Sequence, residues 1–314
     1  CSTWSGAYSR QLRRCRYVNP RSERRLAGVP VNPTGLCMLP GGVLAIASCD
    51  YDDQVACSVQ FIAARSDSDP QALAACRASS LAARRFRGLS GLAHTNDGLL
   101  VCSYLDSPAA LYKFAKDGSM DELATVPKHA DYDRGFKKCA VHQQTQRAYA
   151  IGDANEGSHT LILLDANLQA IATVEATDVA PEDIDDDDYE PIRDVAVHGD
   201  QVIVLTDNAH PKGSGLRLLD LDGVFLRTIA AGQFRNPYAV TASHGRAFVV
   251  DDDDEDEDDN MLHVIEIQSG DVLQSVRLDL GGCVSAILVD GDEIYISSYS
   301  TNDVVVLQLA GSEA

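Results

Sequence analysis

The sequence predicts an all-β fold, a six-bladed β-propeller, from three observations. Short apolar runs rich in Val, Ile, Leu and aromatic residues recur along the chain, separated by Gly, Asp and Asn turns. The runs fall into units that begin near residues 33, 89, 137, 191, 236 and 282, about 50 residues apart. The long helices that a parallel sheet needs between its strands are missing. Six units of four strands at this period describe propeller blades.

Two units display the pattern most clearly, residues 191–232 and 236–281. Each contains four strand-like runs, and tight turns such as Gly199-Asp200 and Ser269-Gly270 separate them. The main helix-like segment is residues 69–83, which we expect to be an insertion in the first blade that decorates its surface.

The two ends of the chain predict how the ring closes. The last unit offers only three strands, residues 283–289, 293–299 and 304–309. Near the start, residues 23–28 parallel the outer-strand residues 225–230, so this N-terminal strand is expected to complete the last blade and to remove two open sheet edges. Residues 23–314 therefore form the propeller, and residues 1–22 are expected to be a basic N-terminal extension with five arginines.

One stretch resembles a known family. Residues 206–240 carry Asp207, Asp220, Gly223, Gly232, Asn236 and Pro237 at the places where an NHL repeat has its aspartates, its glycines and its Asn-Pro pair. The resemblance is good over 191–242, moderate over 89–126 and 282–309, and poor over the first 80 residues. It implies a six-bladed propeller. Relatives of this kind include interaction domains of ubiquitin ligases, RNA-binding domains, an amidating lyase and gluconolactonase-like enzymes, so the motif specifies the fold and not an activity.

The negative charge is concentrated in two segments. The net charge is −21, but residues 178–190 hold eight carboxylates and residues 251–259 hold nine, which leaves −4 for the rest of the chain. In a propeller, the links between blades and the loops after the second strands share one face, so both runs are expected there. The residues expected to form a partner-binding face are Asp185, Asp186, Asp187, Asp188, Asp207, Asp251, Asp252, Asp253 and Asp254.

Three interpretations of this acidic face stay open. The loops can be solvated chain that only adds solubility, a docking face for a basic protein partner or a neighbouring subunit, or a site for Ca²⁺, which prefers clustered oxygen ligands. The arginines of residues 1–22 and the cluster Arg84, Arg85 and Arg87 can also meet acidic loops of the same or a neighbouring molecule. Nucleic acid is disfavoured as a partner because backbone phosphates need clustered Lys and Arg. No apolar stretch reaches the ~18 residues of a membrane span.

Histidines form the first candidate site in the channel. His94, His142 and His198 fall at equivalent ends of inner strands, where NHL-like repeats usually have Asp, and His244 lies one residue later in its unit. Imidazoles around a channel could bind Zn²⁺. Each could equally be a surface or turn-capping histidine of its own blade.

The opposite channel mouth should be lined by residues at the starts of the inner strands. They include Asn32, Ser90, Lys138, Arg193, Asp194, Asn236, Tyr238 and Ser285. Gluconolactonase-like relatives hold a cation at this mouth with Glu, Asn and Asp; here Lys138 and Arg193 oppose a cation, and Arg193 with Asp194 is expected to be a structural ion pair.

The nine cysteines give no single disulfide framework. Cys49 and Cys57 are close enough in sequence to pair, as are Cys1 and Cys15. Cys37, Cys139 and Cys283 lie in apolar runs and are expected to be buried thiols, as is common in reduced compartments. No glycosylation sequon occurs, which argues against the eukaryotic secretory route and favours an intracellular protein.

The sequence therefore favours a non-enzymatic protein-interaction or assembly module. No nucleophile elbow, phosphate loop or zinc-protease motif is present. The alternative is a metal-dependent hydrolase or lyase with its site in the channel, and a third possibility is a structural subunit of a larger assembly.

Overall fold

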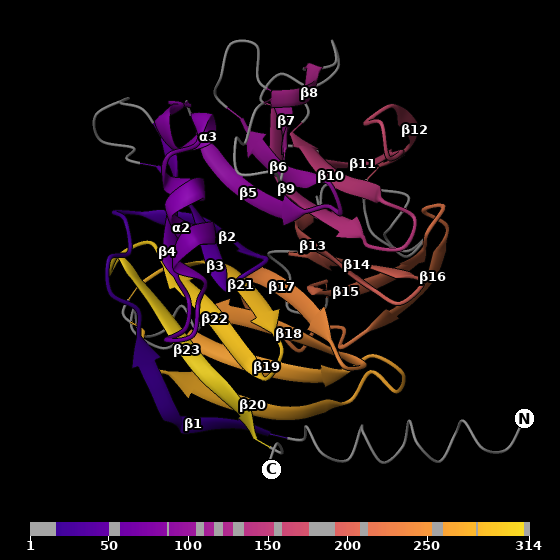
Figure 1. Cartoon of the computed structure of the whole chain (residues 1–314). Coiled ribbons are helices and arrows are strands. Elements are labelled where there is room, and N and C mark those ends of the chain that lie inside the picture. Colours follow the sequence, from indigo (N-terminus) through magenta and orange to yellow (C-terminus); the bar gives the residue numbers. More distant parts are fainter. Residues whose placement is uncertain are drawn as a thin grey trace, which may run out of the picture.

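The protein is a ring of six antiparallel sheets, as Figure 1 shows for the computed structural model. The structure describes residues 17–49, 57–86, 88–104, 110–115, 122–127, 135–153, 159–175, 192–207, 213–252, 260–280 and 282–310. In this part of the chain no helix is long and apolar enough to cross a membrane. The predicted six-bladed propeller is confirmed.

The strands follow the order predicted from the repeat. The inner strands are β2 (Pro33–Leu39), β5 (Leu89–His94), β9 (Gly135–His142), β13 (Ile192–His198), β17 (Pro237–Ser243) and β21 (Val284–Asp290). The second strands are β3 (Val43–Ser48), β6 (Gly98–Ser103), β10 (Arg147–Asp153), β14 (Gln201–Thr206), β18 (Arg246–Asp252) and β22 (Glu293–Ser298). The third strands are β4 (Ser58–Ala63), β7 (Ala110–Ala115), β11 (His159–Leu164), β15 (Gly215–Asp220), β19 (Asn260–Glu266) and β23 (Asp303–Ala310). The outer strands are β8 (Glu122–Pro127), β12 (Ala170–Glu175), β16 (Phe225–Ile229), β20 (Val272–Leu278) and β1 (Tyr17–Arg25).

The core lies between neighbouring blades. The second and third strands are covered on both faces, so β3, β6 and β7 are buried along their whole lengths and consist mainly of apolar residues. Tyr149 of the third blade is fully buried, and its hydroxyl donates to the carbonyl of Leu221 in the fourth blade at 2.9 Å. Contacts of this kind fix each blade against the next and make the ring a rigid scaffold for its loops.

The first blade departs from the predicted four strands. Its sheet contains β2, β3 and β4, and two helices, α2 (Pro70–Arg77) and α3 (Ser80–Ala83), pack against β4. Asp69 caps α2 through the backbone N–H of Gln71, and Pro70 lies in the first turn, where a missing N–H costs nothing. The predicted helical insertion is therefore confirmed. Beyond it, Phe86 forms a single bridge to Cys57 where an outer strand would end.

The N-terminal strand closes the ring, as predicted. β1 pairs antiparallel with β23, from Tyr17 opposite Ala310 to Arg25 opposite Val305. The strand starts at Tyr17, earlier than the predicted residues 23–28. Six residues that were expected in the extension therefore belong to the blade. The register of the pairing is irregular between Asn19 and Arg24.

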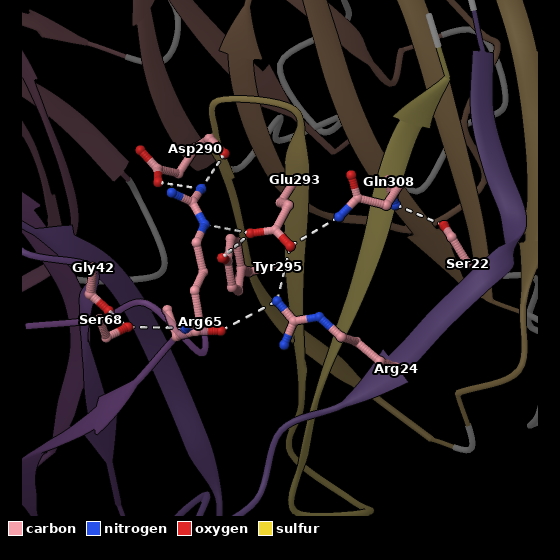
Figure 2. Close-up of polar contacts among 10 residues, drawn as sticks. Ser22, Arg24, Gly42, Arg65, Ser68, Asp290, Glu293, Tyr295 and Gln308 are labelled. Atoms are coloured by element: carbon pink, nitrogen blue, oxygen red, sulfur yellow. Dashed lines mark hydrogen bonds and ion pairs between the residues drawn. The ribbon is translucent and has the colours of Figure 1, made fainter. Parts of the chain in front are cut away.

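A polar cluster ties this closing blade to the first one (Figure 2). Glu293 of β22 accepts hydrogen bonds from Arg24 of β1 at 2.9 Å, from Arg65 after β4 at 2.6 Å and from Gln308 of β23 at 2.8 Å. The Tyr295 hydroxyl donates to the same carboxylate at 2.6 Å. One carboxylate thus joins the N-terminal strand, the last blade and the first blade.

The cysteines that the structure describes include one disulfide, buried thiols and an exposed thiol. Cys1 and Cys15, which the sequence also allowed to pair, lie outside the described residues. Cys49 and Cys57 form a disulfide, one of the pairings that the sequence allowed. Cys37 and Cys139 are buried free thiols, as predicted. Cys283 is exposed, so its predicted burial is wrong; it lies just before β21, outside the strand that its apolar surroundings suggested.

Candidate functional site

Strand ends and links between blades meet on one face of the ring, here called the loop face. The inner strands begin and the second strands end on this side, and three contacts show it. Asp207, after β14, pairs with Arg193 at the start of β13. Asp251, near the end of β18, accepts the backbone N–H of Asn236, just before β17, at 2.8 Å. Asn302, after β22, accepts the N–H of Asn32, just before β2, at 2.6 Å.

Both acidic runs connect strand ends of the loop face. The first lies between the end of β12 and the start of β13, and the second covers the last residues of β18 and the link to β19. Asp185, Asp186, Asp187, Asp188, Asp253 and Asp254 lie outside the described residues, as does the side chain of Asp252.

Two carboxylates expected on the partner-binding face turn inward instead. Asp207 is 6% exposed and is held by the Arg193 guanidinium, with Nε to Oδ2 at 2.8 Å. Asp251 is 5% exposed and accepts the backbone N–H groups of Arg235 and Asn236. Asp251 thus satisfies the backbone N–H groups of the link before β17, and Asp207 joins the end of β14 to the start of β13 through a side-chain ion pair.

Arg193 therefore pairs with Asp207. The sequence had suggested an ion pair with Asp194 instead. The reason is a β-bulge: in β13 the register shifts between Ile192 and Asp194, which leaves Arg193 as the extra residue. The bulge recurs at the same place in every inner strand. Its extra residues are Thr34, Ser90, Lys137, Arg193, Tyr238 and Ser285, and the residues that follow them are Gly35, Gly91, Lys138, Asp194, Ala239 and Ala286.

Three of the bulge residues join neighbouring blades around the channel mouth. The Thr34 hydroxyl donates to the Leu89 carbonyl at 2.8 Å, and the hydroxyls of Ser90 and Ser285 donate to the carbonyls of Lys137 and Pro33. Tyr238 accepts at its hydroxyl from the Asn236 side chain at 3.0 Å. Most of the predicted mouth residues thus stabilise the mouth itself.

Glycine after the bulge permits close packing of neighbouring blades. We therefore predict that a methyl group added at Gly91 strongly destabilises the fold. A Cβ there would lie 2.9 Å from both the Lys137 oxygen and the Lys138 Cα, which are backbone atoms that cannot move aside locally. Gly91→Ala should lower the free energy of unfolding by about 2–3 kcal/mol. Gly35→Ala is the matched control, because its nearest contact would be 3.2 Å. Urea denaturation checks this, and an equal or larger loss for Gly35→Ala would contradict it.

Lys138 and Asp194 are the charged residues among the six that follow the bulges. Lys138 reaches from the third blade to the carbonyl oxygens of Thr34 in the first blade, at 3.2 Å, and Ser285 in the sixth, at 2.8 Å. Asp194 accepts the N–H groups of Val195 at 2.8 Å and Val240 at 2.9 Å. Burial raises the pKa of Asp194, and the charge of Lys138 and the two N–H groups oppose that rise. The sequence could not predict these contacts of Lys138 across the channel, because Thr34 and Ser285 are about 100 and 150 residues away from it in the chain.

The structure does not gather the three predicted histidines into a metal site. His142 Nδ1 hydrogen-bonds to Thr145 in its own turn at 2.7 Å, and His198 Nε2 accepts the N–H of Gly245 in the next blade at 2.9 Å. Burial, then the neighbouring His244, lower the pKa of His198, which keeps it neutral as an acceptor. The carbonyl of His94 accepts from the Gln143 side chain at 2.7 Å. Within the described ranges, no three His, Cys, Asp or Glu side chains are arranged to hold a metal ion.

Comparison with known proteins relates the chain to others by fold alone. No family model matches it, and no curated protein matches by sequence. The NHL resemblance therefore stays a prediction beyond the propeller itself.

Three solved structures are similar to this chain over most of its length. BamB from Moraxella catarrhalis aligns over 93% of this chain and 100% of its own, at 10% identity and a TM-score of 0.52. Chaetomium thermophilum Raptor aligns over 100% of this chain but only 30% of its own, at 11% identity and a TM-score of 0.57. A chain of the nidogen–laminin complex aligns over 80% of this chain and 86% of its own, at 9% identity and a TM-score of 0.53. At such identities the likeness establishes a β-propeller and no more.

Proposed function

We propose that the chain is a non-enzymatic protein-interaction or assembly module, which docks a basic protein partner or a neighbouring subunit on its loop face. The observation that carries this proposal is that both acidic runs join strand ends of one face. Together residues 178–190 and 251–259 account for 17 carboxylates of a chain whose net charge is −21. The partner-binding residues proposed within them are Asp185, Asp186, Asp187, Asp188, Asp252, Asp253 and Asp254.

Physical chemistry supports a basic partner. Like charges anchored close together on a rigid ring repel one another, and an approaching cationic surface relieves that repulsion and speeds association. Loops on such a scaffold can vary without disturbing its core. The nidogen–laminin complex offers a precedent for a chain of this fold in an assembly of two proteins.

The test compares three forms of the full chain as affinity baits in an extract of the source cells. In the neutral form, the carboxylates of residues 178–190 and 252–259 become amides, and Asp251 is left intact because it holds the link before β17. In the matched control, the aspartates of the same segments become Glu, which keeps the charge. We expect the wild type and the Glu form to retain the same basic proteins, and the neutral form to lose them.

The outcomes separate the alternatives. Retention of the same proteins by the neutral form, or of none by any form, would contradict docking through these loops. Binding that persists at high salt would also contradict it, because exposed charge pairs are screened within about 8 Å at physiological ionic strength. A calorimetric titration with Ca²⁺ that gives heat with the wild type and not with the neutral form would instead assign the loops to a cation.

A further inference from the structure

The central channel contains a cavity of about 430 Å³ that all six inner strands line. This volume lies in the range of small-molecule sites. Its lining combines polar surface with aliphatic residues, Leu36, Leu92, Val195 and Ile287 among them. The cavity is therefore large enough for a ligand of about ten heavy atoms with an apolar part.

The charged lining of this cavity is nearly confined to one opposed pair. Of the six residues that follow the bulges, four are Gly or Ala, and the other two are Lys138 and Asp194. Asp290 also lines the cavity, but Arg65 binds its carboxylate at 2.7 Å and compensates its charge. One cation and one anion thus face a space that small residues leave open.

Both members of this pair keep hydrogen-bonding capacity. An ammonium group has three donors, and the described contacts of Lys138 are with the Thr34 and Ser285 carbonyls. A carboxylate has about four acceptor positions, and Asp194 accepts the N–H groups of Val195 and Val240. Lys138 and Asp194 interact through their charges, and the described hydrogen bonds of each do not include the other.

We propose that this cavity binds a small zwitterion, an α-amino acid with an aliphatic side chain. Its carboxylate would accept from Lys138, its ammonium would donate to Asp194, and its side chain would pack against the aliphatic part of the lining. A ligand with a single charge would compensate one member of the pair and leave a like charge beside the other, which is costly in a site removed from water. The proposal is independent of partner docking on the loop face.

The first experiment uses the full chain and L-leucine, with L-leucine methyl ester and N-acetyl-L-leucine as matched controls that each lack one charge. We expect leucine at ten times its dissociation constant to raise the unfolding midpoint by about 2 °C, and the two controls to give no shift. No shift with leucine, valine or methionine up to about 10 mM would overturn the proposal, because binding that weak would be negligible. Equal shifts with the two single-charge controls would also overturn it.

Variants then locate the site. Lys138→Met and Asp194→Asn should each weaken leucine binding at least tenfold by calorimetry, whereas Lys113→Met, a buried lysine whose ammonium pairs with Asp97 outside the channel at 3.0 Å, should bind as the wild type does. If a charge variant does not fold, Thr241→Leu serves instead: Thr241 lines the cavity and is only half-buried, so the variant keeps both charges, narrows the cavity and should abolish the leucine shift. Undiminished binding by these cavity variants would contradict the assignment.

Discussion

Deletion of residues 1–25 is expected to lower the free energy of unfolding by at least about 5 kcal/mol, because it removes the strand that closes the ring. β1 supplies the main-chain pairing along β23, the buried side chain of Val18 and the contact of Arg24 with Glu293. Its loss also exposes the edge of β23, which is a template for aggregation. We expect the unfolding midpoint to fall by about 7 °C or more in a thermal scan.

Deletion of residues 1–16 is the matched control for this experiment. It leaves every described contact of β1 in place, since the strand begins at Tyr17. The longer deletion should therefore be far more destabilising than the shorter one. Equal stability of the two truncated proteins would show that β1 does not close the ring.

Glu293→Gln is the second change with a large expected effect. Burial raises the pKa of Glu293, but hydrogen bonds from Tyr295, Arg24 and Arg65 outweigh burial and lower this pKa to about 2. Figure 2 shows these donors converging on the carboxylate. Burial, and then the same carboxylate, raise the pKa of Tyr295 to about 12. We expect a loss of about 2 kcal/mol at pH 7, less than the full pKa displacement implies, because Arg24 and Arg65 are partly open to water.

The pH dependence of this loss has a definite sign. A carboxylate whose pKa is lower in the folded than in the unfolded protein stabilises the fold above the unfolded pKa, near 4.5. That contribution disappears as the pH falls toward about 2. The difference in stability between wild type and Glu293→Gln should thus be constant from pH 5 to pH 8 and shrink below pH 4.5, as measured by urea denaturation. Glu266→Gln, whose carboxylate accepts from the hydroxyl of Ser269 in its own turn, is the control. A difference that grows on acidification would contradict the account.

The fold was predictable because the sequence patterns that specify it are local and recur in each blade. Turn pairs such as Asp222-Gly223 and the spacing of apolar runs set the blades, and the likeness of residues 23–28 to 225–230 predicted the closing strand. The first blade was less predictable, since its outer strand is replaced by α2 and α3, and a helix in a surface insertion does not reveal which strand it displaces.

The site was predictable only in outline. The sequence placed Arg193 and Asp194 at the channel mouth but paired them with each other, because the bulge that turns them to different partners leaves no mark on the apolar pattern. Similarly, the sequence predicted that Asp207 and Asp251 belong to an exposed acidic series. In the structure both are buried, because Asp207 pairs with Arg193 and Asp251 accepts the N–H of Asn236. Lys138 could be assigned to the mouth, but its reach across the channel depends on small residues contributed by distant blades.

Zero-length cross-linking with a carbodiimide tests the docking of a basic partner most directly, because it joins a carboxylate to a lysine only where the two are in contact. The wild-type chain, bound to a protein retained by the affinity experiment, would be cross-linked and the products mapped by mass spectrometry. Docking on the loop face predicts links from residues 178–190 and 252–259 to partner lysines. Links confined to carboxylates of the opposite turns, such as Asp200 and Asp271, would contradict it.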